Sequence, residues 1–514
     1  MRLLSLCLAF AAASTLAQTN APAKVRELSL QDCIELAIKK NLQLQIDRYS
    51  PEIALYNLRA TYGDYDPTLS LEGRHDHNEA GSQLLAGGFS VPGSVRDDDS
   101  FNAGLSGLLP WGTTYNLATL NPINDVWGNS FTTRAVPSGS GFITNILGIP
   151  FENSAGAVGI NMTQPLLKNF WIDNTRLNIR VGKNRVKYSE LNLRLQVMQT
   201  ITRVEQAYYD LIYTRENLIV QQKAVELAER LVMENRKRLE VGALAPLDLQ
   251  SAEAQAASSR AAVILSQSNQ GTQERTLKAL ITDDYTAEWA TMTLQPSGRL
   301  LAPPPVMNLE DSWNKGLTQR PELLQAKLDV ERQGIVLKYD KNQLFPELDL
   351  IGTYGFNGSG REFSDALYDL QQTDRPFYTF GGQLSFPLSR TRSRNTFKAD
   401  KASMRQLVLT VKQWEQNIMI TIDNDIGVVR ANFDQVQATR AAREYEEAAL
   451  DAEQKKLESG KSTTYTVLQV QRDLTTARGN EIQALDNYNK SLSQLSLDEA
   501  TTLERLGVDF STTK

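Results

Sequence analysis

Only two histidines occur in the chain, and a single residue separates them. His75 and His77 form a His-x-His pair, which is a weak signal for metal binding. A structural zinc site takes four ligands and a catalytic one three protein ligands, and Cys33 is far away in the sequence. We therefore interpret the two histidines as polar residues near the end of a strand, and we predict no metal site.

The remaining clusters of reactive side chains are also weak signals. Asp97–Asp99 and Asp283–Asp284 are acidic runs that we interpret as solvated loop charges. No nucleophile elbow, phosphate-binding loop or zinc signature occurs. The sequence thus predicts a protein that is not an enzyme and has no catalytic residue and no cofactor. A net charge of −6 without a basic tract also argues against nucleic acid as a partner.

The N-terminus resembles an export signal. Arg2 precedes the apolar run LLSLCLAFAAASTLA, and small residues stand before Gln18. We interpret residues 1–17 as a secretory signal peptide, which is too short to act as a membrane span. Cys7 follows Leu6 rather than a small residue, so lipidation is not expected. Cys33 then remains alone, and no disulfide within the chain is possible. After the signal no apolar run reaches about 18 residues, so no transmembrane helix is predicted.

The chain contains an internal duplication. Residues 28–71 superpose without a gap on residues 307–350, and residues 238–260 on residues 456–478. Such a repeat indicates one body built from two similar halves. We predict a first structural repeat at 18–282, a linker at 283–307, a second repeat at 308–497 and a C-terminal tail at 498–514. Each repeat should run helix, β-segment, long helix, tight turn, helix.

The helical segments are unusually long. From about residue 176 to residue 241 there is no proline, which allows a helix of roughly 100 Å. A period-seven apolar stripe follows it and recurs in the second repeat, with Arg443 as the one break; this pattern indicates coiled-coil packing. The stripe consists of Val204, Leu211, Leu218, Val225, Val232 and Leu239, then Ile422, Val429, Val436, Leu450 and Leu457.

The β-segments alternate between apolar and polar residues. One face of the second repeat's strands carries Leu348, Leu350, Tyr354, Tyr378, Phe380 and Leu384. Period-two segments fit a half-buried soluble sheet, and they fit equally a membrane β-barrel with its apolar face outward. The export signal and the absence of a globular core favour the barrel with these six residues facing lipid. So few strands cannot close a barrel alone, so this interpretation requires an oligomer.

Over essentially its whole mature length the chain resembles the TolC family of outer-membrane efflux proteins. The motifs that carry the resemblance are LSLQDCIELAIKKN at 28–41, TQPLL at 163–167, which is repeated as FPL at 386–388, and the G-x5-D-L turn at 242–249. The resemblance implies a homotrimer with a twelve-stranded outer-membrane barrel that continues into a periplasmic α-helical tunnel. It also implies that the periplasmic end narrows and docks an adaptor and an inner-membrane pump.

The two helix–turn–helix tips are the candidate gate. Gly242 and Gly460 stand where a helix end favours glycine, and Pro246 restarts the next helix. The family's two gate aspartates are replaced here by Thr466 and Gln469, and a tip arginine by Ser462. The resemblance thus implies a constriction without an acidic double ring.

Asp248 in the first tip does match a family aspartate that holds the gate closed. It could also be only a charge favoured by the helix dipole.

The first β-segment is much longer than the second. About 100 residues separate Pro67 from Pro165, against about 40 between Pro346 and Pro387. The excess contains an apparent hairpin at 101–121 that turns at Pro110–Gly112. We interpret this excess as extended extracellular loops; the alternative is that the hairpin joins the wall and enlarges the barrel.

Together these features predict an α+β membrane protein. Its long coiled-coil-like helices would form a trimeric α-barrel in the periplasm, and its amphipathic strands a shared β-barrel in the outer membrane. The predicted function is a passive exit duct for a tripartite efflux pump or type I secretion system. Its partners would be two further copies, a periplasmic adaptor protein, an inner-membrane transporter and outer-membrane lipid. The alternative is a periplasmic coiled-coil adaptor or an envelope-spacing protein. An adaptor would show one helical hairpin flanked by lipoyl-like β-halves, whereas this chain has two hairpins.

Overall fold

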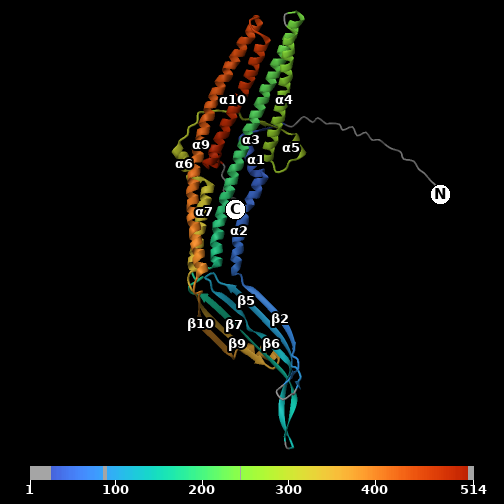
Figure 1. Cartoon of the computed structure of the whole chain (residues 1–514), viewed down its shortest axis with the longest axis vertical. Coiled ribbons are helices and arrows are strands. Elements are labelled where there is room, and N and C mark those ends of the chain that lie inside the picture. The colour runs from blue at the N-terminus through green and yellow to red at the C-terminus, as the bar shows by residue number, and fades with distance from the viewer. Residues whose placement is uncertain (1–24, 85–89, 140, 243–244, 508–514) are drawn as a thin grey trace, which may run out of the picture. The chain divides into compact units, whose positions relative to one another are not determined.

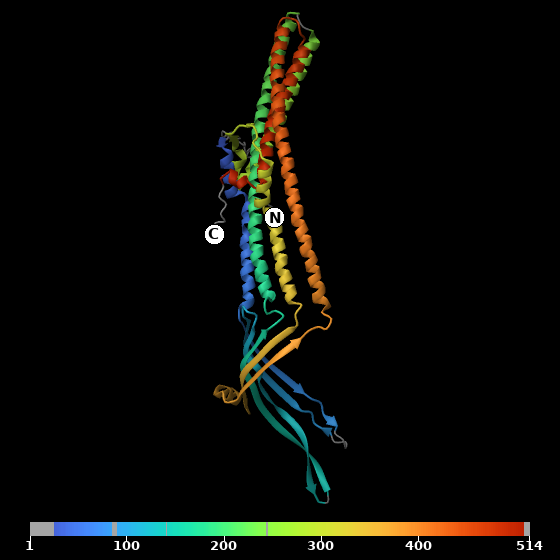
Figure 2. The same cartoon turned by 90° about the vertical axis from the view of Figure 1, so that its left-hand side faces the viewer.

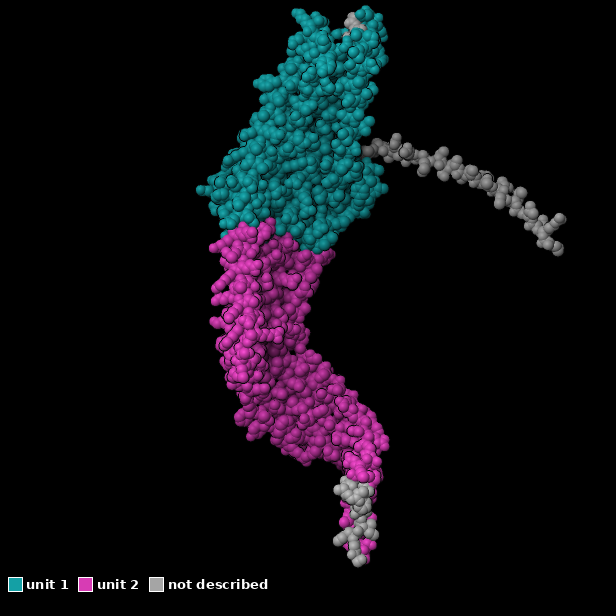
Figure 3. Space-filling view, in the orientation of Figure 1, with its two compact units in different colours: residues 1–48, 193–321, 415–514 teal, residues 49–192, 322–414 magenta. Residues whose placement is uncertain are grey.

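The computed structural model describes residues 25–84, 90–139, 141–242 and 245–507. The predicted signal peptide at 1–17 lies outside the described residues, as does the end of the predicted tail. The chain divides into two compact units (Figure 3). Unit 1 comprises residues 1–48, 193–321 and 415–514, and unit 2 comprises residues 49–192 and 322–414.

In the described part of the chain, no helix combines the length and the apolar character needed to cross a membrane.

Unit 1 is built around two helical hairpins. In the first, α3 (Asn174–Glu240) turns into α4 (Pro246–Ile281); in the second, α9 (Thr391–Glu458) turns into α10 (Thr464–Asp498). Both turns lie at the same end of unit 1 (Figure 1). Near that end the hairpins share one apolar cluster, which contains Leu231, Ala252, Leu450, Leu457, Val467, Leu468 and Leu474.

The predicted coiled-coil stripe is buried throughout the second repeat, at Ile422, Val429, Val436, Leu450 and Leu457. In the first repeat only Val204 and Leu211 are fully buried, and the later stripe residues are half-buried. Farther along α3 the buried apolar positions are Ala228 and Leu231 instead. In a straight α-helix, residues seven apart are rotated by about 20° relative to each other. A strict seven-residue stripe therefore turns gradually away from the neighbouring helix.

Arg443, the one break in the second stripe, forms an ion pair across the second hairpin. Its guanidinium Nε lies 2.8 Å from Glu481 on α10 and its Nη1 lies 3.1 Å from Glu447 on its own helix. The break therefore replaces an apolar contact with a partly exposed charge pair.

Beside the hairpins, unit 1 contains a small α/β layer. The parallel pair of β1 (Val25–Leu28) and β8 (Thr293–Pro296) lies here with four short helices, and a core joins α1 to α3 and α4. These helices are α1 (Leu30–Lys40), α5 (Ala287–Thr291), α6 (Leu309–Gln319) and α11 (Thr502–Arg505). The segment predicted as a linker thus contains both α5 and β8.

The duplication seen in the sequence recurs in local structure. Ser29 and Asn308 occupy equivalent positions, and each caps a helix by accepting a hydrogen bond from a backbone N–H in its first turn. Leu44 and Leu323, also equivalent, are both fully buried.

Unit 2 holds a six-stranded antiparallel sheet in the order β10-β9-β7-β6-β5-β2 (Figure 1). Strands of both repeats meet in this one sheet, where β7 pairs with β9 from Ser154↔Gly360 to Pro165↔Asp349. A separate short pair, β3 (Gln83–Leu84) with β4 (Ser90–Val91), lies in the β2–β5 connection. The six strands are β2 (Thr68–Glu79), β5 (Val95–Leu108), β6 (Thr114–Ser138), β7 (Gly141–Pro165), β9 (Glu347–Gly360) and β10 (Pro376–Ser385).

The hairpin at 101–121 belongs to this sheet, so our interpretation of it as part of an extracellular loop was wrong. β5 pairs with β2 from Thr68↔Ser106 to Glu79↔Val95, and with β6 on its other side. The sequence alternates along both strands of the hairpin, and the sheet follows that alternation except where the register shifts, as between Phe101 and Gly104. The alternative, in which the hairpin joins the wall, is the one that the structure supports.

Four helical segments lie side by side in unit 2, in the order α2, α3, α7, α9 (Figure 2). Here α2 is Leu42–Tyr62 and α7 is Pro321–Asn342. A methyl group added at Gly182 of α3 would lie 2.9 Å from Leu58 of α2, which shows a close approach of these two helices. Asn184 of α3 donates to the carbonyl of Leu328 in α7 at 3.0 Å, and Gln333 of α7 donates to Asp400 of α9 at 2.9 Å.

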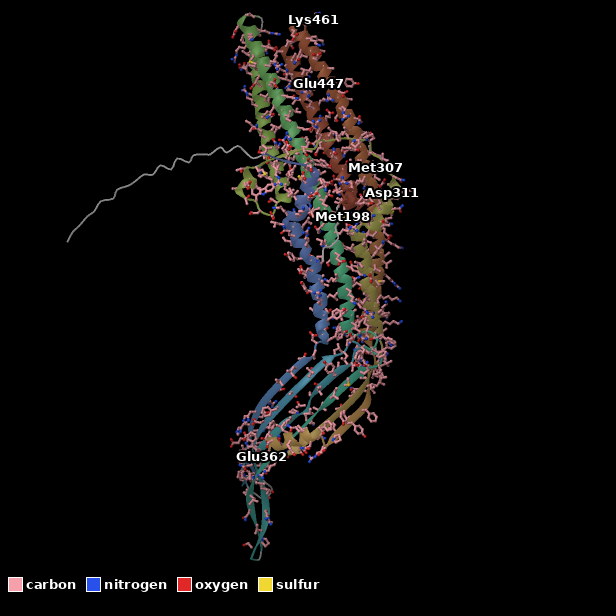
Figure 4. The ribbon with its side chains drawn as sticks, turned by 180° about the vertical axis from the view of Figure 1, so that it is seen from behind. Met198, Met307, Asp311, Glu362, Glu447 and Lys461 are labelled. Atoms are coloured by element: carbon pink, nitrogen blue, oxygen red, sulfur yellow. The ribbon has the colours of Figure 1, made fainter. Side chains whose placement is uncertain are left out.

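The connection between β9 and β10 contains a helix that the sequence reasoning missed, α8 (Phe363–Gln372). Glu362 and Asp365 form a capping box, and Phe363, Ala366 and Leu370 follow at helical spacing. These signals are visible in the sequence but are short enough to be mistaken for a loop. Figure 4 labels Glu362 at the start of this helix.

Candidate functional site: the hairpin turns and the exposed strand face

Both hairpin turns depend on a glycine in the left-handed region. Gly242 has φ +74° and Gly460 has φ +75°. The N–H of Gly242 donates to the carbonyl of Leu239 at 2.9 Å, and after the second turn Lys461 N–H donates to Lys456 at 2.8 Å. A side chain at either glycine would cost roughly 1 kcal/mol or more in this backbone conformation. The predicted role of both glycines in ending a helix is confirmed.

The second turn uses its hydroxyl groups locally. Thr463 caps α10 by accepting from the N–H of Thr466 at 3.3 Å, and the two threonine hydroxyls lie 3.0 Å apart. Ser462 donates to the carboxylate of Glu453. Gln469 is exposed one turn farther along α10.

Because neither Thr466 nor Gln469 is ionisable, these two positions add no charge at the turn.

Charges of both signs lie around the second turn, and some of them are paired. The Ser462 hydroxyl and then the Lys456 ammonium, 2.9 Å away, hold the pKa of Glu453 below its ordinary value. Lys461 lies at the turn itself, and Glu447 lies farther along α9 (Figure 4). The turn therefore carries mixed rather than uniformly negative charge.

In the first turn, Pro246 is the first residue of α4 and Asp248 lies in the first helical turn. The N–H of Asp248 donates to the carbonyl of Ala245 at 3.1 Å. This position is favourable for a carboxylate because of the helix dipole. The gating role of Asp248 stays a proposal.

Each hairpin is braced by the same ion pair. Arg260 Nη2 lies 2.7 Å from Glu229 in the first hairpin, and Arg478 Nη2 lies 2.6 Å from Glu447 in the second. These positions match in the internal duplication. Hydrogen bonds from Arg478 and then Arg443 keep the pKa of Glu447 below its ordinary value. Each pair is partly exposed, so its contribution is at most about 1 kcal/mol.

A groove of about 490 Å³ lies between the two hairpins, which we call the inter-hairpin groove. Its lining mixes amides, hydroxyls and small side chains, including Gln221, Ala228, Ser258, Gln471, Arg472 and Asn480. Sequence reasoning missed it because its walls come from helices far apart in the chain. The small residues of α4 were the only available signal.

The predicted alternation of the strands is present, and the apolar face is exposed. Tyr378 and Phe380 are 72% and 81% exposed, and Leu350, Tyr354 and Leu384 are also exposed, whereas Leu348 is half-buried. The register places Tyr354 beside Tyr378 and Leu348 beside Leu384. We call this surface the apolar belt; on the neighbouring strands it continues through Leu69, Leu71, Phe101, Leu117, Val158 and Met162.

His75 and His77 lie on β2 beyond the belt, where each pairs with an aspartate of β5. His75 Nδ1 lies 2.7 Å from Asp99 and His77 Nδ1 lies 2.5 Å from Asp97. Among the side chains that the structure describes, no three or more His, Cys, Asp or Glu are arranged to hold a metal ion. Asp97–Asp99 thus belong to a strand and not to a loop as we expected.

A pair of carboxylates lies where α9, α10 and the end of α6 meet in unit 1. Burial, and then the neighbouring Asp498, raise the pKa of Asp425 to about 7. Arg320 Nη2 lies 2.9 Å from Asp498, and Gln494 donates to the other oxygen of Asp498 at 2.7 Å. Asp425 therefore holds a proton in the folded protein at pH values where an ordinary aspartate has lost it.

Replacing Asp425 with asparagine is expected to make the protein more stable at pH 8 but not at pH 4. Since the folded pKa is raised, the stability that this proton supplies is complete below about pH 4 and is lost as pH rises through about 7. The gain at pH 8 should be about 1 kcal/mol, after discounting for the partial exposure of Asp425. Melting temperatures at both pH values check this. Asp423→Asn, an exposed neighbour, is the matched control, and an equal gain for both variants would contradict the assignment.

A family model described as outer membrane efflux protein matches residues 150–282 and 314–497, which together make up more than half of the chain. The chain belongs to the outer membrane efflux protein family. The outer membrane protein TolC of Vibrio cholerae serotype O1 is 24% identical over 359 residues, covering 67% of this chain and 77% of that protein. The outer membrane efflux protein BepC of Brucella suis is 23% identical over 360 residues, covering 69% of this chain and 74% of that protein.

Solved structures agree in fold. The outer membrane protein VceC from Vibrio cholerae superposes with a TM-score of 0.64 at 16% identity, covering 94% of this chain and 97% of that one. The Campylobacter jejuni CmeC outer membrane channel gives a TM-score of 0.64 at 15% identity, covering 94% and 90%.

Membership of this family makes the chain an outer-membrane efflux channel rather than an enzyme. The predicted family, fold class and location are thereby confirmed. The family implies a trimeric channel that works with efflux pump components. It favours the channel over the alternative of a periplasmic adaptor or spacer. The repeat boundaries and the roles of individual site residues stay predictions.

Proposed function

We propose that three copies of this chain form a passive exit duct that joins a periplasmic adaptor protein and an inner-membrane transporter. The hairpin turns around Gly242–Asp248 and Gly460–Gln469 form its narrowest point and part of its docking surface. The apolar belt contacts outer-membrane lipid. The observation that carries the proposal is the pair of duplicated glycine turns at one end of unit 1.

The belt supports contact with lipid. Large apolar side chains are exposed on one face of the sheet, while the other face carries polar and small ones such as Ser70, Asn161 and Thr353. Exposed aromatic residues also lie in the strand–helix connections, at Trp171, Phe345 and Phe386, and in the β5–β6 turn, at Trp111. Aromatic girdles of this kind flank the apolar band of outer-membrane barrels.

Nitroxide labels on neighbouring faces of β9 test the lipid assignment. A label at Leu350 should be accessible to oxygen, and a label at Thr353 to a water-soluble relaxation agent. The two residues lie on one strand with opposite side-chain directions, so each is the control for the other. Water accessibility at both positions would show that the belt does not face lipid.

Photocrosslinking from the second turn tests docking. Tyr465 is 64% exposed beside the turn, and Tyr285, 50% exposed, lies away from both turns. A photoreactive residue at Tyr465 should capture a periplasmic adaptor protein of an efflux pump, and the same residue at Tyr285 should not. Heat-resistant trimers in an outer-membrane fraction are expected for both. Capture of the adaptor from Tyr285 but not from Tyr465 would show that the adaptor does not dock at the hairpin turns.

A further inference from the structure

The sheet of unit 2 is open at both edges. Among the described strands, β2 and β10 each pair on one side only. β2 leaves the helical segments at Thr68, and β10 returns to them at Ser385, so the two edges run in opposite directions. Both edges carry apolar residues on the belt side, Leu69 and Leu71 on β2 and Phe380 and Leu384 on β10. An unpaired strand edge is too costly in lipid to remain open.

We propose that β2 of one copy pairs antiparallel with β10 of the next, so that three copies with six strands each close a wall of eighteen strands. This inference rests on the proposed trimer, and it replaces the twelve strands that the resemblance implied. Strand direction alternates across the whole sheet, so edge-to-edge pairing continues an antiparallel barrel with an even strand number.

The added hairpin, β5–β6, is anchored at the end of the sheet nearest the helices. Gly112 in its turn has φ +94°, and a methyl group there would lie 2.8 Å from Arg176 Nη2 of α3. Arg176 in turn donates to the carbonyl of Asn169 at 2.7 Å, and the Thr113 hydroxyl donates to Gln164 of β7. The turn is therefore packed against the helix start, and the hairpin spans the same height as the other strands.

The hairpin is also held at the other end of the belt. Phe101 of β5 packs against Phe363 of α8, with ring centroids 5.1 Å apart. The same helix covers Gly358 of β9, where a methyl group would lie 2.4 Å from Leu370 Cγ. One helix thus contacts both the added hairpin and a strand of the second repeat, which fixes the hairpin in the wall.

The helices that continue from the edge strands fit the same contact. α2 leads into the edge strand β2, and α9 follows the edge strand β10; these two helices are the outer members of the four-helix row (Figure 2). Tyr49, Ile53 and Tyr56 are exposed on α2, and Val408 and Leu409 on α9. Each edge therefore offers apolar helix surface beside an unpaired strand, as a contact between copies requires.

The wall that results is wide. Barrel diameter grows roughly linearly with strand number, so eighteen strands give about 1.5 times the width of twelve. Barrels of 16–18 strands enclose an aqueous channel. The barrel is then wide enough not to limit the passage of cargo, and the hairpin turns form the narrowest point of the duct.

Disulfide trapping tests the edge contact. Cysteine at Ser70 is combined in turn with cysteine at Thr379, Gly381, Gln383 or Ser385, all on the same face of the sheet. Oxidation should yield covalent trimers for at least one pair. Glu72 with Asn102, which are partners on β2 and β5, is the positive control within one copy. Cys33 does not interfere, because it is fully buried and burial raises its pKa to about 12.

Ser70→Cys with Asn161→Cys tests the twelve-stranded alternative, in which the hairpin lies outside and β2 pairs with β7. A crosslink within one copy for this pair would overturn the inference. A density map of the trimer in a lipid nanodisc gives the strand number directly: eighteen is expected, and twelve would overturn it. A chain that forms no trimer would instead contradict the proposed function, which keeps the two failures distinguishable.

Discussion

Replacing Ile422 with aspartate is expected to lower the free energy of unfolding by about 5 kcal/mol and to abolish heat-resistant trimers. Ile422 is fully buried on α9, and α6 approaches it so closely that a methyl group at Gly316 would lie 2.6 Å from its Cδ1. The change removes a large apolar side chain and leaves a carboxyl group without a hydrogen-bond partner. Both effects act on a total stability of only about 5–15 kcal/mol.

Asn424→Asp is the matched control, since it adds the same charge two residues away at an exposed position. It should change stability by no more than about 0.5 kcal/mol. Denaturant titration in detergent and the fraction of trimer that survives heating measure both variants. Equal behaviour of the two would show that the stripe on α9 is not a packing surface.

Replacing both Thr466 and Gln469 with aspartate is expected to raise the cation selectivity of the open channel several-fold. In a trimer the double change would add two rings of three carboxylates at the second turn. Like charges around a narrow, low-dielectric opening raise the local cation concentration. The unaltered channel, whose charges near the second turn are mixed in sign, should prefer cations only weakly. Reversal potentials in planar bilayers under a salt gradient measure the change, and block by divalent cations should increase with it.

Gln471→Glu supplies the control for this prediction. At 100° per residue position 471 lies on a different face of α10 from 466 and 469, so its added charge should not line the opening. It should leave the reversal potential unchanged. If the double aspartate variant also leaves it unchanged, the turn does not form the constriction and the proposed gate is misplaced.

Local signals were sufficient for much of this protein. Gly242 and Gly460 were predictable as helix ends because their backbone conformation is one that glycine adopts without strain. The faces of β9 and β10 followed from alternation, because side chains in a strand point to opposite sides with a period of two. The duplication places Leu44 and Leu323 at equivalent positions, and both are fully buried, since equivalent sequence repeats the same packing. These conclusions depend only on neighbours within a few residues or on a comparison of the chain with itself.

Only the tertiary structure decided the features that depend on contacts between distant segments. The hairpin of β5 and β6 would show the same alternation in the main sheet and in an extracellular loop. Its pairing with β2 and β7 shows that it belongs to the sheet. The raised pKa of Asp425 depends on its burial and then on Asp498, which lies far from it in the sequence. The inter-hairpin groove has walls from both repeats. In each case the local sequence determined the secondary structure and the exposed faces of a segment. Which distant segment it contacts depends on long-range packing, and local periodicity carries no information about that.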